Sequence, residues 1–351
     1  PEINVREKIS ELDKPSGTAG QAMLAAETPQ EQFNLISAGR RNLIINGDQR
    51  IAQRGTSATG VVGSGYYIND RMLLGCSTNA SGTYTLSQST DAPAGFKNSF
   101  KLDCTTANSN PNQLRLNYQV EGSDVSHLNY GSANAQTLTL SFWVKSNVTG
   151  TYTLSIETST AQRFFASHYT IDTANTWEYK TIQIVGDTAN TISTTNVVGL
   201  TLSFWLTSPS SLKQDKVPNG WVTNSSYDTI VGSDFNVNMA SSTSNEWMIT
   251  GLQLELGKVA TPFEHRSYGE ELALCQRYCY VIQQENNSVN ANASACNGTY
   301  YSASSFYGVL VFPTTMRVTP TMAVPTVTNG YRIYSATGAD LRDGTGFGLQ
   351  S

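Results

Sequence analysis

The sequence of 351 residues has little charge and no excess of basic residues. Its 22 Lys and Arg are outnumbered by 27 Asp and Glu. Proteins that neutralise the phosphates of nucleic acids usually carry a basic patch or stripe, so we expect no nucleic-acid partner. Charged residues make up only 14% of the chain, and most of its polarity comes from Ser, Thr, Asn and Gln. This balance is typical of a protein rich in strands and loops.

Long apolar segments are also missing. No apolar run reaches the roughly 18 residues that a membrane-spanning helix needs, and no basic segment followed by an apolar one marks a signal peptide. We therefore expect no membrane partner.

The five cysteines are odd in number and widely spaced, which is not the pattern of a disulfide framework. Cys275 and Cys279 would share one face of a helix, but a zinc site needs about four N or S ligands. We expect buried free thiols that act as small apolar groups, a chain that folds in a cytoplasm, and no cofactor.

Catalytic motifs are lacking as well. Each of His127, His168 and His265 could act as a base, but no sharp turn that presents a Ser or Cys nucleophile accompanies them. Carboxylate pairs that cleave glycosidic bonds are recognised by their spacing in three dimensions, so the sequence does not identify one. We expect a protein that is not an enzyme.

The middle of the chain, residues 42–266, alternates apolar and polar residues with the period of a β-strand. In Leu138–Lys145, apolar residues at even positions face one way and Thr139, Ser141, Trp143 and Lys145 face the other. Several such segments, separated by Gly, Asn, Ser and Asp clusters, predict a mainly β fold with an antiparallel β-sandwich. The predicted strands are Thr83–Ser87, Asn112–Val120, Thr137–Lys145, Gly150–Glu157, Thr176–Val185, Val198–Thr207 and Glu246–Leu256.

The two ends of the chain differ from this middle region. Residues 1–41 contain two short amphipathic helical patterns that have no core of their own, and they either dock on the sandwich or anchor the chain in a larger assembly. The candidate anchoring residues are Val5, Ile9, Leu12, Phe33, Leu35 and Ile36. Residues 267–351 predict a linking helix over Glu270–Ile282, with Ser267 as its N-cap, and then a smaller β domain with strands at Phe306–Pro313, Thr321–Thr328 and Tyr331–Ser335.

Tryptophan residues are the best candidates for binding a ligand. Trp143 and Trp205 occur in the same context, Leu-Ser-Phe-Trp, so Phe142 and Phe204 are expected in the core and both Trp rings on the opposite faces of their strands. An exposed aromatic ring stacks on the apolar face of a sugar. Trp143, Trp205 and Trp177 are therefore candidate glycan-binding residues. The alternative is that these rings pack under loops or against a neighbouring subunit.

Several motifs resemble a domain of phage tail-fibre-like virion structural proteins. The longest begins with Gly-Leu-Gln-Leu-Glu-Leu-Gly at residue 251, and position 72 has Met where the family pattern has Trp. The opening motif and the Ser-Phe-Trp-Val-Lys-Ser strand also resemble jelly-roll carbohydrate-binding modules. The matching segments are Arg41–Thr56, Asp70–Met72, Val120–Gly122, His127–Gly131, Leu138–Ser146 and Gly251–Tyr278.

The resemblance implies a jelly roll in which Leu43–Gly47 lies beside Ile249–Leu254. It also implies a homotrimeric tail-fibre-type appendage of a tailed bacteriophage, assembled in the host cytoplasm with other virion proteins, that binds host surface polysaccharide. Modules of this kind often hold a structural Ca²⁺, for which Asp48 and Glu255 are weak candidates. Two alternatives stay open: a purely structural head fibre, decoration or connector protein, and a tailspike that degrades polysaccharide.

Overall fold

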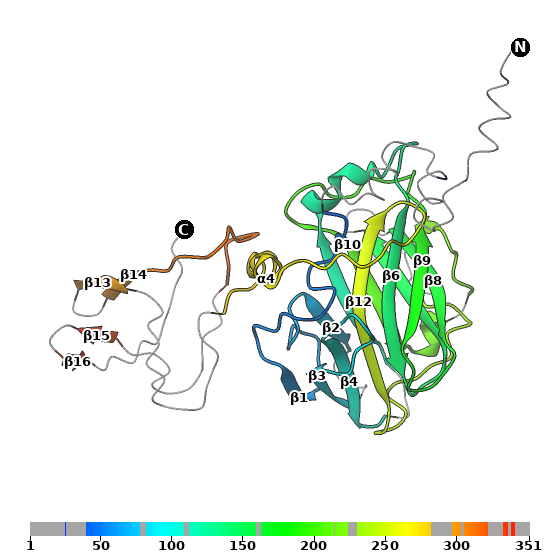
Figure 1. The fold of residues 1–351 in the computed structure, drawn as a ribbon, viewed down its shortest axis with the longest axis horizontal. Coiled ribbons are helices and arrows are strands. Elements are labelled where there is room, and N and C mark those ends of the chain that lie inside the picture. Colours follow the sequence, from blue (N-terminus) through cyan, green and yellow to red (C-terminus); the bar gives the residue numbers. More distant parts are fainter. Residues whose placement is uncertain are drawn as a thin grey trace, which may run out of the picture.

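The computed structural model describes residues 25, 40–77, 82–108, 112–158, 163–213, 215–223, 230–281, 297–302, 305–321, 333–335 and 338–340. Most of them belong to a β-sandwich of two six-stranded antiparallel sheets. In Figure 1 the sandwich forms the larger body, and the hairpins of the C-terminal region lie beyond helix α4 (Tyr268–Gln276). The predicted mainly β architecture, an antiparallel sandwich of jelly-roll type, is confirmed.

The first sheet, called sheet A, has the order β1-β3-β4-β12-β6-β9. Its long central strand, β12, pairs with β4 on one side and β6 on the other. The strands are β1 (Ser57–Val61), β3 (Thr83–Ser89), β4 (Ser99–Thr106), β6 (Leu138–Ser146), β9 (Glu178–Ile184) and β12 (Glu246–Leu256).

The second sheet, called sheet B, has the order β11-β8-β7-β10-β5-β2. The central strands β7 and β10 are buried along most of their length. The strands are β2 (Met72–Cys76), β5 (Leu114–Glu121), β7 (Gly150–Thr158), β8 (Arg163–Ile171), β10 (Val198–Thr207) and β11 (Trp221–Thr223). The 3₁₀ helices η1 (Gly122–Leu128) and η2 (Ser210–Leu212) lie in the connections.

The core lies between the two sheets and follows from the alternation in the sequence. Phe142 of β6 and Phe204 of β10 meet across it with ring centroids 5.2 Å apart, and Tyr169 of β8 is also 5.2 Å from Phe142. Phe142 and Phe204 have no exposed surface. Burial of such aromatic rings dominates the stability of a β-sandwich, because each removes a large apolar area from water. The predicted core positions of both Phe residues are confirmed.

The first segment of the sandwich lies beside the last strand, as predicted. The Leu43 amide donates to the Leu254 carbonyl at 2.8 Å, and the Leu252 amide donates to the Gly47 carbonyl at 3.0 Å. The Asn42 side chain adds two bonds, because its Oδ1 accepts from the Leu254 amide and its Nδ2 donates to the Leu252 carbonyl. The segment therefore runs along β12 although its own backbone is not a regular strand.

Helix α4 has the predicted N-cap, but it begins at Tyr268, two residues before the predicted start, and ends earlier than predicted. Ser267 caps it, since its side chain accepts from the Glu270 amide, and Glu270 and Glu271 lie in its first turn. The helix stops at Gln276 and not at Ile282, and the side chains of the next two residues, Arg277 and Tyr278, both bind Glu121 of β5. No helix among the described residues is long and apolar enough to cross a membrane.

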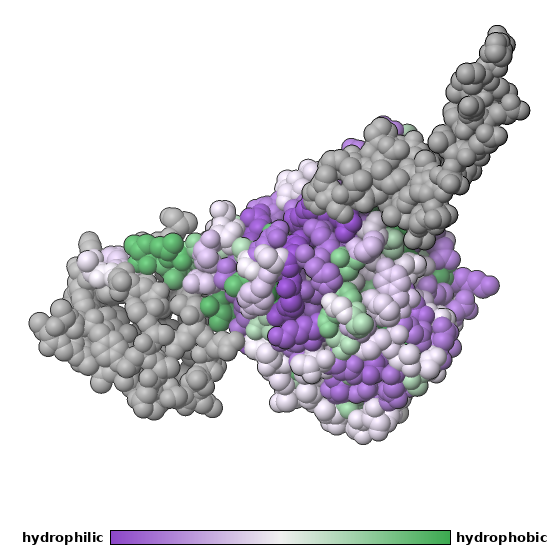
Figure 2. Space-filling view, in the orientation of Figure 1, coloured by the Kyte–Doolittle hydropathy of each residue, from purple (hydrophilic) through white to green (hydrophobic). Residues whose placement is uncertain are grey.

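The C-terminal region contains the hairpins β13 (Asn297–Ser302) with β14 (Ser305–Val309), and β15 (Ile333–Ser335) with β16 (Gly338–Asp340). The predicted strand at Phe306–Pro313 ends at Val309, and that at Tyr331–Ser335 is confirmed over Ile333–Ser335; residues 322–328 lie outside the described part. In Figure 2 the sandwich surface is mostly polar, and apolar surface gathers near β14, where Val309 is 75% exposed.

Candidate functional site

Trp143 and Trp205 occur in the same sequence context, Leu-Ser-Phe-Trp. In the structure they lie on different sheets and in different surroundings. Each lies on the face of its strand opposite to the neighbouring Phe residue, and Trp205 still belongs to the main cluster of buried apolar residues. Trp205 of β10 is only 2% exposed. Its indole N–H donates to Ser155 Oγ at 2.8 Å, and the Arg115 guanidinium lies 4.8 Å from its ring centroid. The prediction of an accessible binding ring at Trp205 is therefore wrong: the outer face of sheet B is covered there, and the ring serves packing.

Trp143 of β6 lies half-buried on the outer face of sheet A. Tyr179 of β9 is its cross-strand partner, with ring centroids 5.2 Å apart and planes inclined by 49°. Tyr179 is 45% exposed. The two rings form a continuous aromatic surface at the edge of the sheet, within reach of a ligand.

Gly251 extends this surface across β12. It lies in a bulge of the strand with φ of +64°, a left-handed conformation that favours glycine. A Cβ there would lie 2.7 Å from Phe96 Cζ and 3.1 Å from Trp143 Cδ1. The missing side chain thus allows both rings to approach the strand. Phe96 in turn packs on Phe263 with centroids 5.0 Å apart and on His265 at 5.4 Å.

Trp177 lies near the same edge, one residue before β9. Its indole N–H donates to Asp91 Oδ1 at 2.9 Å, and Lys145 Nζ donates to Asp91 Oδ2 at 2.7 Å. The hydrogen bond from Lys145 lowers the pKa of Asp91 below its usual value, with Trp177 adding to the effect. Asp91 is therefore a carboxylate held between an indole and the ammonium group of Lys145, which lies two residues after Trp143 on β6.

We call the surface formed by Phe96, Trp143, Trp177 and Tyr179 with Asp91 and Lys145 the aromatic face. Its rings offer apolar surfaces for stacking, and its charged groups offer donors and acceptors for hydroxyl groups. The sequence identified Trp143 and Trp177. It also contained a signal for Tyr179, which alternates with Trp177, but none for Phe96 and Asp91, which lie in a loop far from β6 along the chain.

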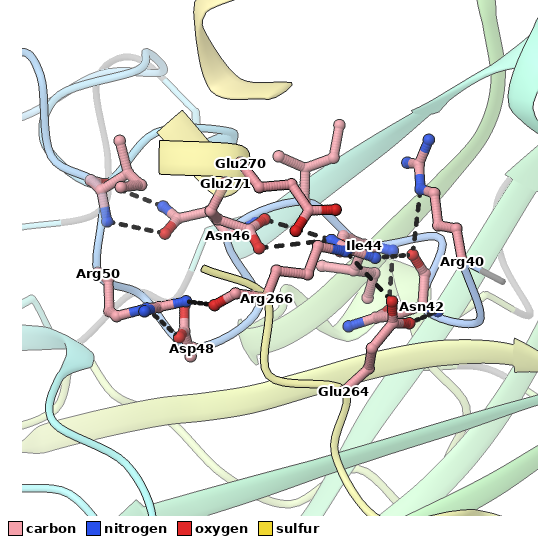
Figure 3. A network of polar contacts seen from close by, with 12 residues as sticks. Arg40, Asn42, Ile44, Asn46, Asp48, Arg50, Glu264, Arg266, Glu270 and Glu271 are labelled. Carbon is pink, nitrogen blue, oxygen red and sulfur yellow. Dashed lines mark hydrogen bonds and ion pairs between the residues drawn. The ribbon is translucent and has the colours of Figure 1, made fainter. Parts of the chain in front are cut away.

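The two weak calcium candidates belong to one extended hydrogen-bond network, part of which Figure 3 shows. At one end, the Asp48 carboxylate pairs with Arg50, whose Nη2 donates to the Arg266 carbonyl at 2.7 Å. Burial raises the pKa of Asp48. The Arg266 side chain in turn contacts Glu264 and Glu271 at 3.4 and 3.3 Å. These contacts hold the segment around Asp48 and Arg50 against Arg266 and the start of α4.

At the other end of the network, both oxygens of Glu255 are occupied. Thr261 donates its amide to Oε1 at 2.9 Å and its hydroxyl to Oε2 at 2.5 Å. Gln253 donates to Oε1 and accepts from the Glu264 amide at 2.8 Å. Among the described residues no group of three or more His, Cys, Asp and Glu is arranged to hold a metal ion. In the structure, Asp48 binds Arg50 and Glu255 binds Thr261 and Gln253, so both carboxylates contact other residues of the chain.

Two further residues singled out in the sequence, Cys275 and His168, pack among other side chains of the protein. Cys275 is fully buried against Ile45 and Ile51, as expected for an apolar thiol, and burial raises its pKa. His168 Nδ1 lies 3.0 Å from Thr153 Oγ1, and burial lowers the pKa of His168. The predicted anchoring residues Val5, Ile9, Leu12, Phe33, Leu35 and Ile36 lie outside the described residues.

No family model and no curated protein matches the sequence. Among solved structures, the enzymatically active domain of tailspike protein 4 of bacteriophage CBA120 is 13% identical with a TM-score of 0.31, covering 62% of this chain and 21% of the tailspike chain. A putative sugar binding protein from Bacteroides thetaiotaomicron is 10% identical with a TM-score of 0.34, covering 62% of this chain and all of its own. A family 16 carbohydrate-binding module is 12% identical with a TM-score of 0.26, and the match covers 48% of this chain and 84% of the module.

Proposed function

We propose that this chain is a fibre-type appendage protein of a tailed bacteriophage that binds host surface glycans through its aromatic face. The observation that carries the binding proposal is the pair of Trp143 and Tyr179, whose rings lie side by side at an accessible sheet edge with centroids 5.2 Å apart. Each ring offers an apolar surface on which a sugar ring can stack.

The charged groups beside the rings fit the same ligand. Asp91 carries a proton acceptor next to the Lys145 ammonium, and the Trp177 indole N–H is oriented toward that carboxylate. A sugar that stacks on Trp143 would present its equatorial hydroxyl groups to such donors and acceptors. The low overall charge of the chain agrees with a neutral, hydroxyl-rich partner.

The virion role rests on the sequence motifs that resemble tail-fibre-like proteins between residues 41 and 280. In this proposal the chain is displayed on the particle as a homotrimer, held to other virion proteins by its first 41 residues, and it binds glycans without cleaving them. Several weak sites on one particle would then act together, because linked sites bind at a high effective concentration.

The test is a glycan array and a host-cell binding assay with the purified full-length chain. We expect Trp143→Ala and Tyr179→Ala each to weaken binding by about tenfold or more, since loss of a stacking ring removes roughly 1–2 kcal/mol. Tyr268→Ala is the matched control, because Tyr268 is 57% exposed on α4 and is not one of the residues that form the aromatic face. Binding that survives both ring substitutions would reject this face as the site.

Incubation of the wild-type chain with host polysaccharide separates binding from cleavage. We expect no new reducing ends under conditions in which the polysaccharide is bound. Their appearance would instead support a tailspike that degrades its receptor.

A further inference from the structure

A cavity of about 120 Å³ lies where the end of α4 meets the sandwich. Its polar lining comes from segments that are far apart in the sequence. A single ordered water needs roughly 10–15 Å³ of such space, so the cavity has room for several waters or for a small organic molecule. Its polar and charged lining includes Arg54, Tyr66, Asp70, Arg71, Glu121 and Arg317.

Three of the motifs found in the sequence converge on this cavity. Asp70 and Arg71 come from the second motif, Val120 and Glu121 from the third, and Tyr278 from the end of the longest one. The aromatic face uses none of these residues. The cavity is therefore a second place where groups capable of binding gather, and an inference drawn from it does not depend on the glycan proposal.

Arg71 is the most unusual of the lining residues. It is only 7% exposed, and its backbone has φ of +74°, a strained conformation for a residue with a side chain. The guanidinium lies 3.5 Å from the ring centroid of Tyr278 and 5.1 Å from that of Tyr118. One nitrogen, Nη2, donates to the Gln119 carbonyl, whereas Nε is buried without a hydrogen-bond partner. A buried donor of a charged group that has no acceptor lowers stability, so the fold holds Arg71 beside the cavity at a cost in both backbone conformation and hydrogen bonding.

Both acidic residues of the lining, Glu121 and Asp70, already accept hydrogen bonds from other residues of the chain. Glu121 accepts from Arg277 Nη2 at 2.6 Å, from the Tyr278 hydroxyl at 2.7 Å and from the Ser123 hydroxyl at 2.8 Å. Asp70 accepts from the amide and the side chain of Gln53. Arg54 lies 3.9 Å from Asp70, at the outer limit of an ion pair.

The cavity is lined by more arginine residues than acidic residues. Arg54, Arg71 and Arg317 carry three positive charges against two negative ones from Asp70 and Glu121. Arg277, which pairs with Glu121, raises the excess further. The charge of the lining therefore favours an anion.

We propose that this cavity binds a small anion bearing a carboxylate or phosphate group, held by Arg71 with Arg54 and Arg317. Arginine suits this role because its planar guanidinium donates in a fork that matches both groups. A ligand there would also contact the end of α4 and the segment around Arg317, which joins the sandwich at Asn196 through hydrogen bonds of 2.6 and 2.9 Å. Binding would accordingly tighten the junction between the sandwich and the C-terminal region.

The experiment is titration calorimetry of the full-length chain at low ionic strength with three probes: sodium glucuronate, inorganic phosphate and neutral glucose. We expect at least one of the anions to bind with a Kd on the order of 1 mM and glucose not to bind in this range. Binding by glucuronate alone would assign the carboxylate class, and binding by phosphate alone the phosphate class. Affinity should fall as salt is raised, because partly exposed charges such as Arg54 are screened.

Substitutions of the lining arginines test whether the anion binds in this cavity. Arg54→Gln and Arg317→Gln should each weaken the bound anion by about tenfold, and Arg71→Gln should abolish binding. Because Arg71 is buried and its substitution can unfold the chain, the two less buried positions carry the test. Lys216→Gln, an exposed cation outside the lining, is the matched control.

Cys279 supplies a local readout, because this half-buried thiol also lines the cavity. We expect the bound anion to slow alkylation of Cys279, measured by mass spectrometry of its peptide. The proposal is overturned if neither anion binds at low salt, if Arg54→Gln and Arg317→Gln bind as the wild type does, or if Cys279 is alkylated at the same rate with and without a bound anion.

Discussion

Arg277 Nη2 lies 2.6 Å from Glu121 Oε1, and this contact joins the residue after helix α4 to the end of β5, 156 positions earlier. Tyr278 and Ser123 donate to the same carboxylate. Burial alone would raise the pKa of Glu121, but the hydrogen bonds from Arg277, Tyr278 and Ser123 outweigh it and lower the pKa to about 2. The junction between the sandwich and the C-terminal region is therefore stabilised by an ionised carboxylate.

The first prediction concerns this carboxylate. Glu121→Gln should lower the free energy of unfolding by about 2 kcal/mol at pH 7, after allowance for the partial exposure of Arg277. The folded-state pKa of Glu121 lies below the 4.5 of an ordinary glutamate. Its contribution is therefore complete above about pH 5 and is lost as the pH falls toward 2. Denaturant unfolding of both proteins across this range should show the difference shrinking with acid.

The control is Asp124→Asn, which removes a partly exposed pair with Arg40 at 3.5 Å. It should change the free energy of unfolding by less than about 0.5 kcal/mol. A difference between Glu121→Gln and wild type that is the same at pH 3 and pH 7 would contradict the first prediction.

The second prediction concerns Gly251→Ala. The new Cβ would meet Phe96 and Trp143 in a backbone conformation that disfavours side chains. We expect a loss of about 2–4 kcal/mol in the free energy of unfolding and an altered near-UV circular dichroism spectrum of the aromatic rings. Gly257→Ala separates the two causes, since Gly257 has φ of +109° but nothing within 4 Å of its Cβ position. Equal losses in both variants would show that the rings do not crowd this site.

The third prediction concerns Trp205→Ala. Removal of this buried ring leaves a cavity and takes away the partner of Ser155 Oγ and of the Arg115 guanidinium. The free energy of unfolding should fall by about 3–5 kcal/mol, while glycan affinity per folded molecule stays unchanged. Trp177→Ala, at a half-buried position, should cost much less stability. A folded Trp205→Ala protein that loses glycan binding would move the site to sheet B.

Much of the sandwich could be predicted because alternation is a local property of a strand. The strands β3, β5, β6, β7, β9, β10 and β12 all fall on predicted segments. The missed strand β8 has Phe164, Phe165 and Ala166 buried in succession, so both of its faces are covered and the alternation is hidden. The missed strand β4 did alternate, with Phe100 and Leu102 inside and Lys101 and Asp103 outside, and the signal was present in the sequence.

The sequence by itself determined which way each aromatic ring points, because successive side chains of a strand face opposite sides of a sheet. Phe142 and Phe204 point inward and Trp143 and Trp205 point outward for this reason alone. Only the tertiary structure decided that Trp205 is covered whereas Tyr179 beside Trp143 is accessible. What lies over a sheet face comes from loops and neighbouring strands distant in the chain, and no local pattern records those contacts.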